Sequence, residues 1–315
     1  MVFGGLVILY IKYGSTNNDI LYIKSHLISP DLETKGYVKA ILWLSFFISF
    51  AIKVPIFPFH TWLPFVHVEA PTIGSMLLAG IMLKLGTYGI IRYSVSILGD
   101  SDYYMPLVII LAVLSIIYGS LTTLRQIDLK KIIAYSSIVH MNFAVLGLFS
   151  QEFEGVLGGS YLMVTHAFVS SGLFLLIGVL YKRYHTRILL YFNGLVFTMP
   201  LFSVMFFLFT LANVSAPLMG SFIAEILIIF STVKINLLIG VLICSSLILS
   251  TSYALWLTNR LLFGQLSAYI HHFADLSKKE LASLLPLLIF TIYLGVSPHA
   301  AVDLLTLPIS LLLNN

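Results

Sequence analysis

Apolar residues follow one another in long runs along almost the whole chain, and short charged or Gly- and Pro-containing stretches separate these runs. A helix of roughly 20 apolar residues crosses a bilayer core. The runs predict nine membrane-spanning helices, at residues 1–13, 38–58, 71–97, 104–124, 130–149, 156–181, 196–231, 235–259 and 281–301. The pattern therefore predicts an all-α, polytopic membrane protein.

Two of these spans contain residues that interrupt a helix. Pro55 and Pro58 lie near the end of the span 38–58, and Pro217 and Gly220 lie in the middle of the span 196–231. Proline removes a backbone donor and clashes with the preceding turn, so each helix should open there. Paired broken helices in two repeats are typical of secondary transporters, whose binding sites lie beside the breaks. The two breaks are compatible with inverted repeats of five helices.

Charged residues in the predicted loops indicate the orientation, because Lys and Arg gather on the inner side of a membrane. One side has nine basic residues: Arg125, Lys130, Lys131, Lys182, Arg183, Arg187, Arg260, Lys278 and Lys279. The other side has six: Lys12, Lys24, Lys35, Lys39, Arg92 and Lys234. The side with nine is then the inner one. With nine spans, the N-terminus lies inside and the C-terminus outside.

Composition excludes several classes of protein. Hydrophobic residues make up 59% of the chain and charged residues 10%, and the net charge of +4 is too small to indicate nucleic-acid binding. The single cysteine, Cys244, excludes a disulfide framework within the chain. Many Phe and Tyr residues beside Leu and Ile fit a gene rich in A and T, as in organelle genomes. This usage favours a mitochondrial origin, with a bacterial plasma membrane as the alternative location.

Three charged residues lie well inside predicted spans: Lys53, Lys84 and Glu225. Lys84 lies at the middle of the span 71–97, where a lysine costs about 2.5 to 3.5 kcal/mol and cannot reach either surface. Residues kept at such a cost are either paired within a helix bundle or part of a proton pathway. Burial favours the neutral form of both lysine and glutamate, which brings their protonation equilibria closer together.

Two histidines also lie inside predicted spans. His140 and His166 are each close in sequence to serine or threonine hydroxyls. A single membrane histidine is more often a hydrogen-bonded core residue than a relay. Because histidine titrates near neutral pH, its occurrence on spans next to those of Lys84 and Glu225 favours a proton relay.

Four further histidines are weaker candidates for a functional role. His60 and His67 lie in the predicted loop after the first break, where a structural role is favoured over a place in proton uptake. His271 and His272 are adjacent in sequence, so they do not face one site on a helix.

Residues 53–94, KVPIFPFHTWLPFVHVEAPTIGSMLLAGIMLKLGTYGIIRYS, resemble the most characteristic segment of the subunit 4 family of proton-pumping NADH:ubiquinone oxidoreductase, respiratory complex I. The resemblance continues through YSSIVHMNF, HAFVSSGLFLLIGVLY and LANVSAPLMGSFIAEI and covers nearly the whole chain in order. It implies an antiporter-like subunit of the membrane arm that translocates protons and transfers no electrons. NADH, FMN, iron–sulfur clusters and ubiquinone are then expected in other subunits, with no cofactor in this chain.

The resemblance also implies a role for each buried candidate. Lys84 matches the central relay lysine and Lys53 its partner lysine in the broken helix. His140 and His166 match the relay histidines, and Glu225 matches the far glutamate. Phe65 departs from the family, which usually has an acidic residue there.

The resemblance divides the chain into three parts. Residues 1–97, with the loop 14–37, would be a remnant of the first antiporter-like repeat, residues 98–262 the second, inverted repeat, and residues 263–315 a loop, a final helix and a tail. Family members carry about five further helices before the position of residue 1, and one of these bears a glutamate that pairs with the lysine at position 53. The acids that precede Lys53 here are Asp19, Asp31 and Glu33, all in a predicted loop.

We therefore expect a separate chain to supply the missing helices and the buried glutamate, with a truncated sequence or a loss of those helices as the alternatives. The other expected partners are the antiporter-like and core subunits of complex I and the lipid bilayer. Two other functions stay open, a sodium/proton antiporter subunit of the same superfamily and a structural scaffold of the membrane arm that conducts no ions.

Overall fold

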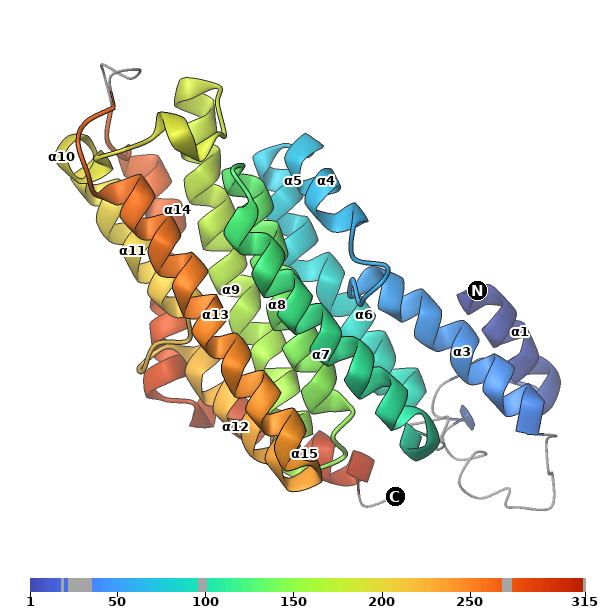
Figure 1. Cartoon of the computed structure of the whole chain (residues 1–315). Coiled ribbons are helices and arrows are strands. Elements are labelled where there is room, and N and C mark those ends of the chain that lie inside the picture. Colours follow the sequence, from blue (N-terminus) through green and yellow to red (C-terminus); the bar gives the residue numbers. More distant parts are fainter. Residues whose placement is uncertain (18–19, 22–35, 96–100, 268–273, 314–315) are drawn as a thin grey trace.

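The computed structural model describes residues 1–17, 20–21, 36–95, 101–267 and 274–313. All regular elements in these residues are helices, so the prediction of an all-α protein is confirmed for them. The long helices lie side by side in one bundle (Figure 1). They are α7 (Ser101–Arg125), α8 (Leu129–Leu148), α9 (Phe153–Tyr184), α13 (Leu237–Leu262) and α14 (Lys278–Val296).

Six helical stretches in the described part are long and apolar enough to cross a membrane: Thr72–Val95, Tyr103–Arg125, Leu129–Leu148, Phe153–Tyr184, Leu237–Leu262 and Lys278–Val296. The other three predicted spans, 1–13, 38–58 and 196–231, fall on shorter helices. These are α1 (Val2–Tyr13), α3 (Gly36–Lys53), and the pair α11 (Pro200–Asn213) and α12 (Gly220–Ile235). One helix was not predicted from the sequence. It is α15 (His299–Leu313), which covers most of the predicted C-terminal tail.

The centre of the bundle is formed by α8 and α9, which pack against each other and against α7 and α12. In α8, 89% of the span is buried inside the protein, whereas the figure for α14 is 22%. Glycines allow the close approach: a Cβ on Gly159 of α9 would lie 2.7 Å from the carbonyl oxygen of Ala144 in α8. On α13, exposed side chains such as Ile248 form an apolar outer face that suits lipid.

The first break follows α3, which ends at Lys53, five residues before the predicted end of its span. Residues predicted as a loop form a short helix, α4 (Trp62–Glu69), and this corrects the prediction. The backbone between α3 and α4 has partners on neighbouring helices, because the Phe57 amide donates to Ser115 Oγ (2.8 Å). Polar backbone groups at membrane depth need such partners.

The second break separates α11 from α12 at residues 214–219. The Ser221 hydroxyl, in the first turn of α12, donates to the Ala212 carbonyl in the last turn of α11 (2.6 Å). The Ala212 carbonyl also accepts the Ser215 amide (3.2 Å), so this oxygen is bonded both by the turn after α11 and across the break. Gly220 lets α12 begin against α9, since a Cβ there would lie 2.7 Å from Thr165 Cγ2.

The predicted span 71–97 is a continuous helical rod with two π-helical segments. It consists of α5 (Thr72–Leu77), the π-helix η1 (Leu78–Met82), α6 (Leu83–Gly89) and the π-helix η2 (Ile90–Val95). The rod packs against α9 on one side and α3 on the other. It therefore lies between the bundle centre and the edge formed by α1 and α3 (Figure 1).

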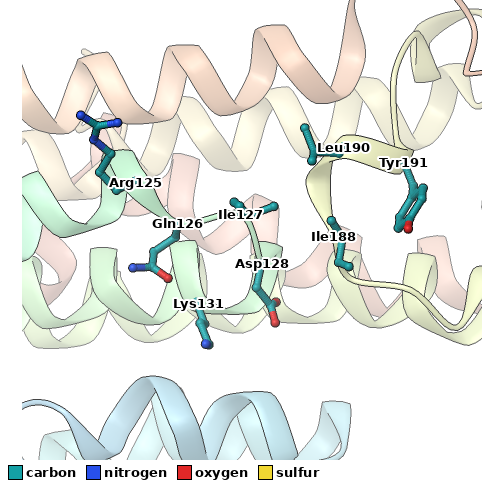
Figure 2. Close-up of a pocket in the computed structure, with 8 residues that line it drawn as sticks. All are labelled: Arg125, Gln126, Ile127, Asp128, Lys131, Ile188, Leu190 and Tyr191. Atoms are coloured by element: carbon teal, nitrogen blue, oxygen red, sulfur yellow. The ribbon is translucent and has the colours of Figure 1, made fainter.

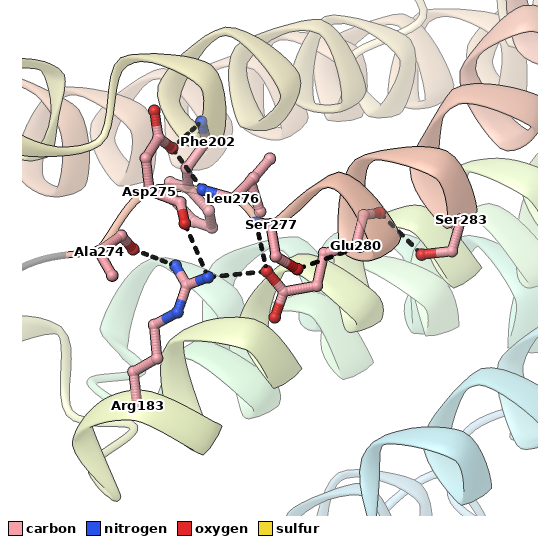
Figure 3. A network of polar contacts seen from close by, with 8 residues as sticks. All are labelled: Arg183, Phe202, Ala274, Asp275, Leu276, Ser277, Glu280 and Ser283. Carbon is pink, nitrogen blue, oxygen red and sulfur yellow. Dashed lines mark hydrogen bonds and ion pairs between the residues drawn. The ribbon is translucent and has the colours of Figure 1, made fainter.

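The segments 125–131, 182–194, 260–267 and 274–280 meet at one end of the bundle, which we call the basic end. Arg183, near the end of α9, donates to the Ala274 carbonyl, to the Asp275 carbonyl (2.9 Å) and to Glu280 Oε2 (2.7 Å) (Figure 3). The Asp275 carboxylate accepts the amides of Leu201 and Phe202 and so caps α11. One arginine and one aspartate thus tie α9, α11 and α14 together.

The opposite end, which the charge pattern predicts to be the outer one, carries a smaller charged group that we call the outer cluster. The Lys234 ammonium, one residue before the end of α12, lies 3.0 Å from Glu154 Oε1 and 3.6 Å from Glu152 Oε2. All three side chains are solvent-accessible. The two short helices η3 (Leu189–Tyr191) and α10 (Leu195–Thr198) lie at the basic end instead.

Candidate functional site

Lys84 and His166 are in direct contact between the rod and α9. The Lys84 Nζ lies 2.9 Å from His166 Nδ1 and also donates to the Ala79 carbonyl (2.5 Å). His166 is 3% exposed, while Lys84 is partly buried. The ammonium of Lys84 is therefore held on the side of the rod that faces α9, by one histidine and one backbone oxygen.

The π-helical segment η1 helps to form this arrangement. Ala79, whose carbonyl accepts from Lys84, lies within η1, where the usual ladder of hydrogen bonds between residues four apart is altered. Single π turns are frequent at functional sites. Gly80 brings η1 close to α9, because a Cβ there would lie 2.9 Å from Ser171 Oγ. The π-helical segment was not predicted from the sequence. Gly80 was the one residue in it that could have indicated a close approach to another helix.

His140 and Glu225 are also in direct contact, between α8 and α12. His140 Nδ1 lies 3.1 Å from Glu225 Oε1, and the two residues are 3% and 4% exposed. The rings of His140 and His166 have centroids 5.5 Å apart and are tilted by 44°. Four of the five predicted site residues thus form one series, in the order Lys84, His166, His140, Glu225.

Three polar atoms around this series have no hydrogen-bond partner among the described residues: Nε2 of His140, Nε2 of His166 and the hydroxyl of Tyr253. Tyr253 lies on α13, is 2% exposed, and is close enough to Glu225 for an electrostatic interaction. Tyr253 is the single tyrosine of the predicted span 235–259, where no site residue was predicted.

Lys53 does not join the series. It is the last residue of α3 and its side chain is exposed, which differs from the expectation of a buried lysine. Its backbone nevertheless lies beside α6, because a Cβ on Gly86 would be 3.0 Å from Lys53 Cβ. The end of α3 is therefore adjacent to the rod two residues from Lys84.

His67 lies outside the predicted spans, on α4, and is fully buried. Its ring stacks on Phe174 of α9 with centroids 4.4 Å apart. Burial, and secondarily the positive charge of Lys130, lowers the pKa of His67 to about 3. The ring is neutral at pH 7 and packs α4 onto α9. Lys130 holds the same helix by donating to the Ala70 carbonyl (2.7 Å).

A cavity of about 660 Å³ opens at the basic end, between the α7–α8 turn and the segment around η3. It is lined by Arg125, Gln126, Ile127, Asp128, Lys131, Ile188, Leu190 and Tyr191. Figure 2 shows the side chains of Arg125 and Lys131 pointing away from each other. The two cations therefore do not converge on one anion.

No group of three or more His, Cys, Asp or Glu side chains that could hold a metal occurs in the residues that the structure describes. His271 and His272 lie outside those residues. The side chains of the series Lys84, His166, His140 and Glu225 carry an amine, two imidazoles and a carboxyl group. Groups of these kinds take up and release protons.

The sequence of residues 1–251 matches the family described as the NADH:quinone oxidoreductase/Mrp antiporter transmembrane family. The chain belongs to this family. It is 46% identical, over 300 residues, to NADH-ubiquinone oxidoreductase chain 4 of Marchantia polymorpha, and the match covers 95% of this chain and 59% of that protein. The chain thus spans about three fifths of the length of this relative.

Two solved structures have the same fold. The chain matched in respiratory complex I of Thermus thermophilus superimposes with a TM-score of 0.87 at 28% identity, covering 99% of this chain and 66% of that chain. A chain of the Mrp complex of Dietzia superimposes with a TM-score of 0.83 at 19% identity, covering 99% and 67%. The antiporter-like fold predicted from the sequence is therefore confirmed.

Proposed function

We propose that this chain is a proton-translocating subunit of the membrane arm of NADH:ubiquinone oxidoreductase, respiratory complex I, in which Lys84, His166, His140 and Glu225 relay protons. Membership of the family and the identity to chain 4 of Marchantia polymorpha support this assignment. The observation that carries it is the series of contacts from the Lys84 ammonium to the Glu225 carboxylate.

In this proposal the chain translocates ions and transfers no electrons. Other subunits of the complex bind NADH, FMN, iron–sulfur clusters and ubiquinone, and a further chain supplies helices with a buried glutamate opposite Lys53. The protein lies in the mitochondrial inner membrane with nine spans, the N-terminus in the matrix and the C-terminus in the intermembrane space. Residues 1–97 and 98–262 belong to two inverted repeats around the two breaks.

Hydrogen-bond chemistry gives the relay a direction. An ammonium group only donates, so Lys84 donates to His166 Nδ1, and a neutral His166 then carries its own proton on Nε2. A carboxylate only accepts, so His140 donates from Nδ1 to Glu225, and its Nε2 is an acceptor. These tautomers are assigned from the contacts. The free nitrogen of one ring is a donor and that of the other an acceptor, which suits transfer between them.

A single transfer moves each proton one place along the series. Lys84 gives a proton to His166 Nδ1, and the Nε2 proton of His166 passes to His140 Nε2 directly or through one water. His140 gives its Nδ1 proton to Glu225. The products are a neutral amine, a carboxylic acid and both histidines in the opposite tautomer. Uptake from the basic end then restores the Lys84 ammonium.

A charge change near Lys53 drives the cycle. Because the end of α3 is adjacent to the rod, a neighbouring subunit that forms or breaks an ion pair with Lys53 changes the electric potential at Lys84. Coulomb interactions of this kind are stronger inside a protein than in water, since the effective dielectric constant is lower. The coupling needs no movement of a helix.

Replacement of Lys84 by methionine, which keeps the length and removes the charge, tests the proposal. Lys84→Met should abolish proton transport driven by NADH in liposomes that contain the assembled complex. Lys279→Met, at an exposed position in the first turn of α14, is the matched control and should transport normally. Normal proton transport by an assembled Lys84→Met complex would show that the relay is wrong and favour a structural scaffold.

A second candidate is a subunit of a sodium/proton antiporter, because the matched family includes the Mrp antiporters as well as the oxidoreductases. The two functions differ in what drives transport. Proton transport that requires an imposed sodium gradient and does not depend on NADH would assign the chain to the antiporters.

A further inference from the structure

The face of α12 that carries Glu225 continues toward the outer cluster. Residues three apart lie on one side of a helix, so Glu225, Ile228 and Ser231 share a face. All three are buried, at 4%, 0% and 0% exposure. Lys234 follows one turn later and pairs with Glu152 and Glu154 at the surface. A buried carboxylate and a surface group of carboxylates are thus connected along one helix face, with one apolar side chain between polar groups.

The apolar side chain, Ile228, occupies a notch between two glycines. Its Cγ1 lies 2.9 Å from the place of a Cβ on Gly147 of α8 and 3.1 Å from the place of a Cβ on Gly158 of α9. Any other residue at either glycine would therefore displace Ile228. The isoleucine fills the contact between α8, α9 and α12 at the level between Glu225 and Ser231.

Two buried hydroxyls lie near each other beyond this contact. A Cβ on Gly155 would lie 2.5 Å from Ser231 Oγ of α12 and would also clash with Ser150 Oγ, next to the end of α8. Each hydroxyl donates to a carbonyl one turn earlier, Ser231 to Ile228 and Ser150 to Gly147, so the lone pairs of both oxygens can accept. Glu154 is the chain neighbour of Gly155 and belongs to the outer cluster.

We propose that this face of α12 is the route by which a proton leaves Glu225 for the outer surface, and that Ile228 is the gate that separates Glu225 from the hydroxyls of Ser231 and Ser150. This inference rests on the relay function proposed above and extends it past Glu225. In the release step the Glu225 carboxylic acid loses a proton and becomes a carboxylate. Water and the two hydroxyls pass one proton on to Glu152 or Glu154, which then releases it to the solvent.

Removal of the gate should convert the route into a leak. Ile228→Ala is expected to raise passive proton flux several-fold in liposomes that contain the assembled complex and no NADH, measured with an enclosed pH-sensitive dye. Ile229→Ala, the next residue on a different face, is the matched control and should leave the flux unchanged. An Ile228→Ala complex that assembles and does not leak would overturn the proposal.

Two further variants exclude a leak through damaged packing. Adding Lys84→Met to Ile228→Ala should remove the leak, because protons then cannot reach Glu225 from the basic end. A leak that persists in this double variant would show simple water penetration and contradict the gate. Ser231→Ala with Ser150→Ala, which keeps the gate and the packing, should slow NADH-driven transport several-fold, and unchanged transport would contradict the route.

Failure of this route can be told from failure of the relay. If Lys84→Met abolishes transport while the Ile228 and serine variants behave as wild type, the relay stands and protons leave Glu225 by another path. If Lys84→Met transports normally, the relay itself is wrong.

Discussion

The two helix breaks look alike in sequence and differ in their surroundings. Both contain proline, and each lies close to an ionisable residue. At the second break, α12 begins against α9 and α14, and its Glu225 is buried beside His140. At the first, α3 lies at the edge of the described bundle and its Lys53 is exposed. A proline break thus positions a charged side chain, while neighbouring helices decide whether it is buried and partnered.

Loss of the carboxylate at the second break should have the largest effect. In Glu225→Gln the side chain keeps its shape but can no longer take a proton from His140. We expect NADH-driven proton transport to fall by about two orders of magnitude, the usual effect of removing a proton-transferring group. Gln151→Ala, on the turn between α8 and α9, serves as a control for assembly. If the Glu225→Gln complex transports protons within a few-fold of wild type, Glu225 does not take a proton from His140, and the proposed difference between the two breaks is wrong.

Loss of the charge at the first break should have a smaller effect. Lys53 acts on Lys84 only through its electric field, and each 1.4 kcal/mol of such coupling changes an equilibrium about tenfold. Lys53→Met should therefore reduce transport less than Glu225→Gln in the same liposome assay, and Lys53→Arg should restore most of it. A Lys53→Met complex as inactive as Lys84→Met would make Lys53 a direct member of the relay.

The region after the first break should also be the more sensitive to acid. The pKa of His67 is lowered from 6.5 to about 3, mainly by burial, so the folded protein disfavours its protonated form. Stability from this site is complete above pH 6.5 and is lost as the pH falls toward 3, at about 1.4 kcal/mol per pH unit. Thermal unfolding in detergent should show less loss between pH 7 and 5.5 in His67→Phe than in wild type. The exposed His299→Phe should behave as wild type, and equal losses in all three proteins would contradict the prediction.

The second break should be weakened slightly by the loss of one hydrogen bond. Ser221→Ala removes the donor to the Ala212 carbonyl and should lower the free energy of unfolding by about 1 kcal/mol. Ser283→Ala, an exposed serine on α14 that bonds only within its own helix, is the control. If Ser221→Ala lowers the free energy of unfolding no more than Ser283→Ala does, the hydrogen bond across the second break does not stabilise the protein.

Local patterns predicted most of the helices, though not α4 or α15, and the identity of four contacting residues. Lys84, His140, His166 and Glu225 stand out because charged or imidazole groups are rare in apolar spans, and their cost favours partners inside the bundle. Their order in space follows from the packing of α8, α9 and α12 with the rod. The sequence alone did not define which histidine contacts the lysine.

Other features depend on contacts that a single sequence does not reveal. The π turn around Ala79 lies against Ser171 of α9 at Gly80, and α4 packs on α9 through His67. Lys53 is exposed on α3, as are Ile41, Leu44 and Ile52. Ser150 and Ser231 come together only through Gly155, far from Ser231 in sequence. Serines in membrane helices usually bond to their own backbone, so their pairing gives no local signal.

The central claim is that Lys84 and Glu225 exchange a proton through the two histidines. Infrared difference spectra of the complex before and after the addition of NADH report the carbonyl stretch of a protonated carboxylic acid. We predict a band that is present in wild type, absent in Glu225→Gln and absent in Lys84→Met. A band assigned to Glu225 that persists in Lys84→Met would contradict the account, because Glu225 would then take its proton from elsewhere.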